Sequence, residues 1–406
     1  MPAEPSPAKL QAILIKVTEA LAGELVHPGP AAPDWSDLEW RMAQAASAMH
    51  GVSPLLRGVL RWEGPPGWTA FLCEQLAHVR ARHARIEELQ SRLDELARSQ
   101  DLAVVALKGA ALHTEGFYRG GERPMADLDL LVHPRDGHRA ACMIESLGYR
   151  ECHRSWKERA FAPLADTGIA RLGEHSDNRI TIELHERICE KLPLRISDIT
   201  PAVYPAQPAP GLNPYPSRAA LMLHLLLHAA ASMAFKTLRL IQLHDLSLLA
   251  ARMTPEEWDE LVSRPAGRAD PWWALPPLQL MSRYYGTALP RYALEPLIAS
   301  CPVHLRRAAL RQTLSDVSLS YLWVDALPGL EWSKSLGAML SYARSRVWPG
   351  SDHMALRRTL LATAPWAAGH SWSGRSQVRR IVSWVTRRQT RPAAMFAVRA
   401  ALARIP

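Results

Sequence analysis

The spacing of apolar residues changes along the chain and distinguishes helical stretches from a shorter region of strands. Between residues 8 and 99, apolar positions recur with helical periodicity, which predicts four helices. These are residues 8–26, a segment through residues 40–45 with Asp34 as its N-cap, residues 52–60 and residues 68–99. We therefore expect residues 1–100 to form an N-terminal helical region.

Strand-like patterns begin after residue 101. Leu102–Leu107 is a continuous apolar run, typical of a buried strand, and Ile180–His185 alternates strictly between apolar and polar residues. A further strand is predicted at 128–132, weaker strands at 149–153, 160–163 and 169–172, and helices at 110–118 and 135–147. Residues 101–199 are thus expected to form a core with a small mixed sheet between helical regions, which is a fold of the α+β class.

The second half of the chain returns to a helical pattern. Six prolines between residues 200 and 216 predict a connector at a domain boundary, and the residues after it predict a helical domain over 217–345. Its most apolar run, Ala219–Phe235, is slightly short for a membrane span, so a buried helix is the better interpretation. The run contains His224 and His228, whose spacing would suit a metal, although their apolar neighbours favour packing.

Composition adds a basic tail to this organisation. The chain has a net charge of +9, and residues 353–406 contain ten arginines but no lysine, aspartate or glutamate. Such a segment can dock on the protein's own body or an acidic partner, on an anionic membrane surface, or on RNA. Five scattered cysteines without a CxxC motif, and an N-terminus without signal-peptide features, predict a cytoplasmic protein without a disulfide framework.

Two aspartates at the start of strand 128–132 are the strongest chemical signal. Side chains alternate along a strand, so the carboxylates of Asp127 and Asp129 project from one face while Leu128 and Leu130 project from the other. Adjacent carboxylates beside a buried strand repel each other and cost desolvation energy, and a divalent cation offsets both effects. The pair therefore predicts a metal site. The alternative is an aspartate pair at a strand edge without a metal.

Further candidate residues lie before this pair and on the later strand 180–185. Gly109 is at the predicted start of a helix, where backbone N–H groups favour anions, and Lys108 and Arg123 are the nearest cations. Each cation has a structural alternative, Lys108 as a surface lysine at a strand end and Arg123 as a residue that fixes its loop. Glu183 is a candidate third carboxylate, as a metal ligand or a proton acceptor, although a surface glutamate would fit the pattern too. His185 is on the same predicted strand face as Glu183. It could help to position the acceptor, or it could be a strand histidine with a structural role only.

These residues form a series that resembles a known family. The series runs through Lys108-Gly109-Ala110-Ala111-Leu112, Tyr118, Arg123 to Val132, Leu147-Gly148-Tyr149 and Ile182 to His185. It resembles a bacterial nucleotidyltransferase family within the DNA polymerase β-like superfamily. The resemblance covers roughly residues 35–250, and its strength lies in the order and spacing of the lysine–glycine pair and the two aspartates.

The resemblance implies a polymerase β-like core that moves a nucleoside monophosphate from an NTP to an acceptor hydroxyl. Asp127, Asp129 and Glu183 would hold Mg²⁺ or Mn²⁺, and Lys108, Gly109 and Arg123 would contact the nucleotide. Many members of the superfamily carry a serine after the glycine. This chain has Ala110 there, which leaves the phosphate contact to the backbone and the two cations. Two alternatives stay open, a toxin-like enzyme that modifies tRNA and a non-catalytic nucleotide-binding module.

Overall fold

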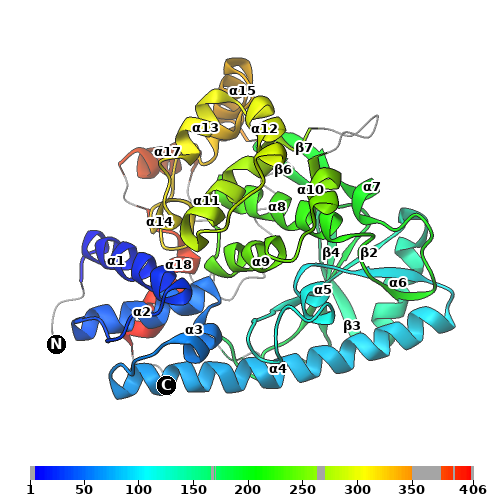
Figure 1. The fold of residues 1–406 in the computed structure, drawn as a ribbon, viewed down its shortest axis with the longest axis horizontal. Coiled ribbons are helices and arrows are strands. Elements are labelled where there is room, and N and C mark those ends of the chain that lie inside the picture. The colour runs from blue at the N-terminus through cyan, green and yellow to red at the C-terminus, as the bar shows by residue number, and fades with distance from the viewer. Residues whose placement is uncertain are drawn as a thin grey trace.

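The computed structural model describes residues 5–165, 169, 171–262, 270–349, 376–386 and 389–403. Figure 1 shows a sheet on one side of the molecule, a body of helices on the other, and the long helix α4 running beneath both. Within the basic tail, residues 353–375, 387, 388 and 404–406 lie outside the described part. No helix of the described residues is long and apolar enough to cross a membrane.

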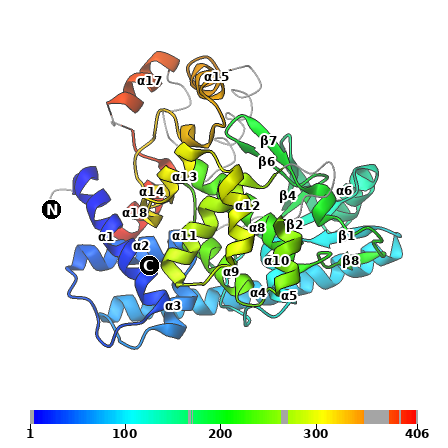
Figure 2. The ribbon, with the colours of Figure 1, turned by 45° about the horizontal axis from the view of Figure 1, so that its top comes forward.

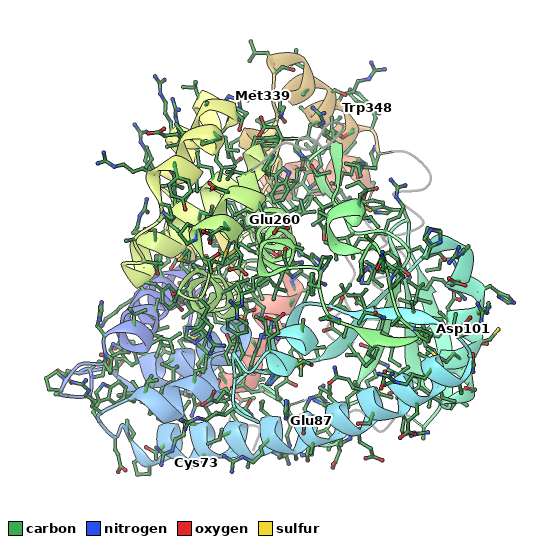
Figure 3. The ribbon with its side chains drawn as sticks, turned by 45° about the vertical axis from the view of Figure 1, so that its right-hand side comes forward. Cys73, Glu87, Asp101, Glu260, Met339 and Trp348 are labelled. Atoms are coloured by element: carbon green, nitrogen blue, oxygen red, sulfur yellow. The ribbon has the colours of Figure 1, made fainter. Side chains whose placement is uncertain are left out.

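Four N-terminal helices confirm the helical periodicity of the first hundred residues. They are α1 (Pro7–Val26), α2 (Asp37–His50), α3 (Ser53–Val59) and α4 (Pro66–Ser99). The N-cap of α2 is Ser36 and not Asp34, because Ser36 and Glu39 form a reciprocal capping box that fixes the start of the helix. Figure 3 labels Cys73 and Glu87 along α4, and both residues are exposed.

A six-stranded mixed sheet follows, with the strand order β3-β4-β5-β2-β1-β8. Its strands are β1 (Ala103–Ala106), β2 (Asp127–Val132), β3 (Tyr149–Arg154), β4 (Glu158–Pro163), β5 (Thr181–His185) and β8 (Gly211–Asn213). The helices between them are α5 (Lys108–Thr114) and α6 (Gly137–Ser146), with the 3-10 turn η1 (Pro134–Asp136) before α6. A separate hairpin pairs β6 (Cys189–Leu192) with β7 (Arg195–Asp198).

The two faces of this sheet have different neighbours. Leu128, Leu130, Ile182 and Leu184 belong to a core that the sheet shares with α4 and α6. Residues of the opposite parity on β2 and β5 face the helical half of the molecule, and Leu131 belongs to that larger core. Because side chains alternate along a strand, Asp127, Asp129 and Leu131 of β2 point toward the helices that follow the sheet.

The helical half is built around a buried central helix. This helix is α8 (Arg218–Ala234), which contacts α9 (Leu240–Ala250), α10 (Pro255–Val262) and α11 (Leu275–Tyr285). The remaining elements are α7 (Thr200–Val203), η2 (Trp272–Ala274), α12 (Arg291–Ser300), α13 (Val303–Ala309), α14 (Leu314–Val317), η3 (Leu330–Trp332), α15 (Leu336–Val347), α17 (Gln377–Val385) and α18 (Pro392–Leu402). Helix α18 returns to pack on α2, as Figures 1 and 2 show.

Two segments differ from the sequence prediction. The proline-rich stretch expected to be a connector contributes β8, which pairs in parallel with β1 at the edge of the sheet. This pairing is possible because Gly211 adopts a positive φ of 103° where the chain turns into the strand. The strand predicted at 169–172 is absent from the residues described there, which belong to the long connection between β4 and β5.

Candidate functional site

The carboxylates singled out in the sequence meet on neighbouring strands. Strand β2 pairs in parallel with β5, and the register places Asp129 opposite Glu183 and Asp127 opposite Thr181. Side chains of residues that are opposite in a sheet lie side by side on the same face. The sheet therefore brings Glu183 beside two aspartates that lie more than fifty residues earlier in the chain.

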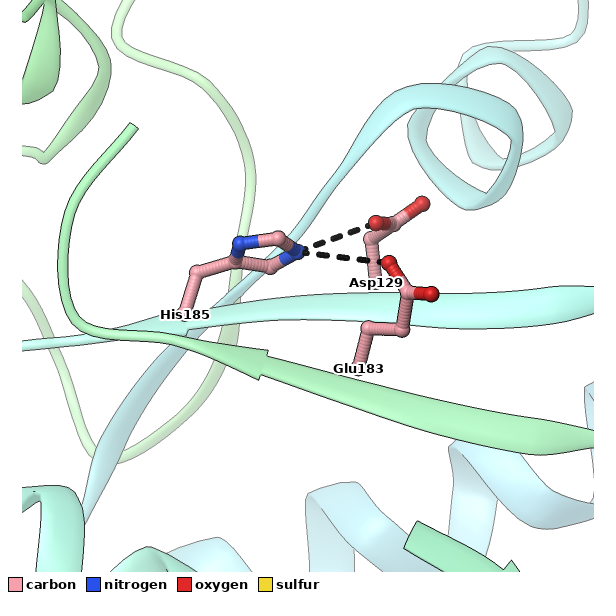
Figure 4. Close-up of side chains that lie close together, drawn as sticks. All are labelled: Asp129, Glu183 and His185. Carbon is pink, nitrogen blue, oxygen red and sulfur yellow. Dashed lines mark hydrogen bonds and ion pairs between the residues drawn. The ribbon is translucent and has the colours of Figure 1, made fainter. Parts of the chain in front are cut away.

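Asp129 is the most heavily coordinated of the three. Lys108 Nζ lies 2.7 Å from Asp129 Oδ1, and His185 Nε2 lies 3.0 Å from the same oxygen. His185 Nε2 also lies 3.8 Å from Glu183 Oε2, so the imidazole points between the two carboxylates (Figure 4). A metal ion could bridge three of these groups. Each of Asp129, Glu183 and His185 offers one ligand atom, and these atoms lie within 4.8 Å of one another.

The three carboxyl groups differ in how readily they ionise. Burial would raise the pKa of Asp129, but Lys108 and His185 hold it well below its usual value. Burial, together with the charge of Asp129, raises the pKa of Asp127. The pKa of Glu183 rises to about 9, because the group is buried and two aspartates lie nearby. Among the three carboxyl groups, only Asp129 forms an ion pair with a lysine in the described residues.

Lys108 is held in an unusual backbone conformation. Its φ of +47° lies in the left-handed region, which costs a residue with a Cβ on the order of 1 kcal/mol. Its N–H donates to the hydroxyl of Tyr215 (3.1 Å), and that hydroxyl lies 2.7 Å from His224 Nδ1. Burial lowers the pKa of His224 far below its usual value, so the ring in this contact is neutral. This chain of contacts fixes the turn between β1 and α5 and directs Nζ at Asp129.

Arg123 connects the loop before β2 to the helical half. Its Nε and Nη2 donate to the two carboxylate oxygens of Asp245 on α9 at 2.9 and 2.8 Å, and Tyr118 donates to the same carboxylate at 2.7 Å. A Cβ at Gly109 would overlap Arg123 Nη1 and lie 2.8 Å from Met125 Sδ. A larger residue at this position would therefore displace the side chains of Arg123 and Met125. Both interpretations of Arg123 remain compatible with this geometry, because its side chain fixes the loop and also lines the cavity described next.

A cavity of about 310 Å³ connects these groups. The sheet side of its wall carries six of the residues singled out in the sequence, which are Lys108, Gly109, Arg123, Asp127, Asp129 and Glu183. The opposite side carries residues of α8 and α9, among them His228 and Asp245, together with Arg239 at the start of α9. The cavity therefore has an acidic floor on the sheet and a mixed wall on the helices.

A family model described as uncharacterised nucleotidyltransferase matches residues 36–272. That range is more than half of the chain and contains the whole wall of the cavity. The chain belongs to this nucleotidyltransferase family. Searches of curated proteins and of solved structures gave no significant match.

The sequence analysis did not identify part of the wall of this nucleotidyltransferase cavity. Arg239, Lys157 and Gln242 line it, and Tyr215 supports Lys108 from behind. Arg239 lies within an apolar helical pattern, and Tyr215 lies in the proline-rich stretch, so neither carries a local signal. His224 and His228 are four residues apart on α8 but take different places. His224 contacts Tyr215, whereas His228 lines the cavity, so the described residues do not show the pair acting as a joint metal site.

Proposed function

We propose that this protein is a metal-dependent nucleotidyltransferase with a polymerase β-like core, which transfers a nucleoside monophosphate from an NTP to an acceptor hydroxyl. The family to which the chain belongs supports the reaction class. The observation that carries the proposal is the meeting of Asp127, Asp129 and Glu183 on adjacent strands at a cavity that cations also line. Phosphoryl-type transfer needs this combination of metal-binding carboxylates and donors for phosphate oxygens.

The residues present fit a divalent metal ion such as Mg²⁺ or Mn²⁺. Burial and mutual repulsion raise the pKa of both Asp127 and Glu183, so their ionised forms lack sufficient positive charge nearby. Oxygen ligands are those that Mg²⁺ prefers, and the imidazole of His185 beside them suits Mn²⁺ as well. Asp127, Asp129 and Glu183 would hold the metal, which would supply Lewis-acid stabilisation of charge on the phosphoryl oxygens.

The chain's own cations have separate tasks in this proposal. Lys108 holds Asp129 in its ionised form through the 2.7 Å contact, which keeps a metal-binding oxygen available. Arg123 presents the side of its guanidinium near Gly109 to the cavity, while Asp245 holds the other side. Reaction then forms a bond between the acceptor oxygen and the α-phosphorus, breaks the bond to pyrophosphate and releases the proton of the acceptor hydroxyl to a base.

Nucleotide binding tests the proposal before any acceptor is known. We expect the wild-type protein to gain thermal stability from at least one of the four NTPs in the presence of Mg²⁺ or Mn²⁺, and to lose that gain in Asp127→Asn. The matched control is Asp177→Asn, which changes an exposed aspartate on the connection before β5. If no NTP shifts the wild-type protein with either metal, the proposed activity is wrong.

A further inference from the structure

Among the described residues, four cationic side chains line the cavity, and three of them have carboxylate partners. Lys108 lies 2.7 Å from Asp129, and Arg123 lies 2.8 Å from Asp245. Lys157 lies 3.0 Å from Glu190 and 3.5 Å from Glu158. The fourth is Arg239, for which the described residues provide no ion pair. Arg239 is therefore the cavity cation that forms no ion pair among the described residues.

The guanidinium of Arg239 is held in place by neutral groups. Its Nε donates to the carbonyl of Met49 in the last turn of α2 at 3.0 Å. Arg239 Nη2 lies next to Gly51, and a Cβ added at Gly51 would be 2.6 Å from it. Gly51 is the C-cap of α2 and has a φ of +68°. The backbone N–H of Arg239 donates to Gln242 Oε1, which fixes the residue at the start of α9. One edge of the side chain is thus anchored to α2, and the side chain as a whole lines the cavity.

An anchored, half-buried arginine without a carboxylate partner carries a desolvation cost. Burial lowers the pKa of Arg239, and the nearby charge of Arg123 lowers it further, whereas Glu174 and Asp127 act in the opposite direction from beyond ion-pair distance. Buried cations in proteins are normally paired. The missing partner is therefore expected to be an anion that enters the cavity, and the planar fork of a guanidinium matches the oxygens of a phosphate.

We infer that Arg239 is a binding residue for the polyphosphate chain of the donor nucleotide. The inference rests on the proposed function for the identity of the ligand, and on the geometry of Arg239 for its place. It assigns one wall of the nucleotide site to the helical half of the molecule, at the start of α9, opposite the carboxylates of β2 and β5. Arg239 would act by binding and orienting the phosphates and would take no part in proton transfer.

Titration calorimetry with ATP and with inorganic tripolyphosphate, both in Mg²⁺, tests the inference on the full chain. We expect Arg239→Gln to weaken the binding of both ligands by roughly 10- to 100-fold, the loss typical of a charged hydrogen-bonding group. Arg239→Lys keeps the charge but loses the fork, so it should fall between wild type and Arg239→Gln. The matched control is Arg283→Gln, which removes another guanidinium anchored on backbone carbonyls, those of Leu310 and Gln312, outside the cavity.

The outcomes separate this inference from the proposed function. If wild type and Arg239→Gln bind ATP equally well, the role of Arg239 is refuted and the nucleotidyltransferase proposal stands. If wild type binds tripolyphosphate through Arg239 but binds no NTP, the phosphate contact stands and the proposed function falls. A folded wild-type protein that binds neither tripolyphosphate nor any of the four NTPs overturns both. Equal weakening in Arg239→Gln and Arg283→Gln would show a general structural effect and would also overturn the inference.

Discussion

Two buried polar clusters in this protein are built on opposite principles. The cavity cluster consists of Lys108, Asp127, Asp129, Glu183 and His185. The junction cluster consists of Gln11, Thr18, His50 and Ser320, all buried where α1, α2 and the start of α9 meet the segment after α14. The first gathers charges of mostly one sign, whereas the second consists of neutral groups.

The junction cluster satisfies its members internally. Gln11 donates to the carbonyl of Ser320 at 3.0 Å and accepts from the N–H of Leu322 at 2.6 Å. Leu240 N–H donates to His50 Nδ1, so the ring proton lies on Nε2 and is donated to Ser320 Oγ, which in turn contacts Thr18. A satisfied neutral network stabilises the fold, whereas a cluster of like charges costs stability and is expected where function requires it.

The largest expected effect separates function from stability in the cavity cluster. Asp127→Asn should reduce nucleotidyl transfer by about 10³-fold or more, because one metal-binding carboxylate is lost. The free energy of unfolding should stay the same or increase, because the change removes a buried charge that burial and Asp129 disfavour. Turnover of radiolabelled NTP and urea unfolding measure the two effects. A large loss of stability would place Asp127 with the structural groups and would break the comparison.

The Arg123–Asp245 pair should behave differently, although it lines the same cavity. Asp245→Asn leaves the buried guanidinium of Arg123 without its partner, which should cost about 3–5 kcal/mol of unfolding free energy. The double variant Arg123→Met/Asp245→Leu removes both charges and should recover most of that loss. Urea unfolding of the single and double variants measures the coupling. If both are equally destabilised, packing and not charge pairing accounts for the effect.

In the junction cluster, loss of one side chain should affect stability alone. Gln11→Leu leaves the carbonyl of Ser320 and the N–H of Leu322 without this partner, which should cost about 2–4 kcal/mol. Nucleotide binding should not change, because Gln11 does not line the cavity. The control is Gln90→Leu on α4, a half-buried glutamine whose side chain has no hydrogen bond among the described residues. A change in nucleotide affinity in Gln11→Leu would show that the two clusters are coupled.

The two clusters also differ in what the sequence could predict about them. The strands that carry Asp127, Asp129 and Glu183 follow from local alternation, and the structure confirms strands at 127–132 and 181–185. The parallel register of Asp129 with Glu183 follows from no local pattern, because the long connection between these strands includes β3, β4 and α6. The same holds for β8, whose pairing with β1 depends on contacts with α4 that proline content cannot reveal.

Residues that act through long-range contacts were beyond sequence reasoning. Arg239 gains its position from the end of α2, about 190 residues earlier in the chain. Likewise, His50 and Ser320 meet only in the folded protein, since neither belongs to a motif. The functional residues of a strand could therefore be predicted from the sequence, whereas residues that meet from separate helices could not.

The smallest expected effect is a pH dependence that arises from the junction cluster. Burial, helped by the charge of Arg239, lowers the pKa of His50 from 6.5 to about 3 in the folded protein. Between these values the unfolded chain binds more protons than the folded chain, so stability must fall as the pH decreases below about 6.5. For His50 alone the loss should reach about 2 kcal/mol at pH 5.

His50→Gln should remove this dependence, because an amide can keep both hydrogen-bonding roles without titrating. We expect its unfolding free energy to change less between pH 7 and pH 5 than that of wild type. Buried His224 and His228 retain their own dependence of the same sign, since burial also lowers their pKa. The exposed His27→Gln serves as the control and should follow wild type. An equal pH response in His50→Gln and wild type would mean that the acid sensitivity arises in other groups and not at the helix junction.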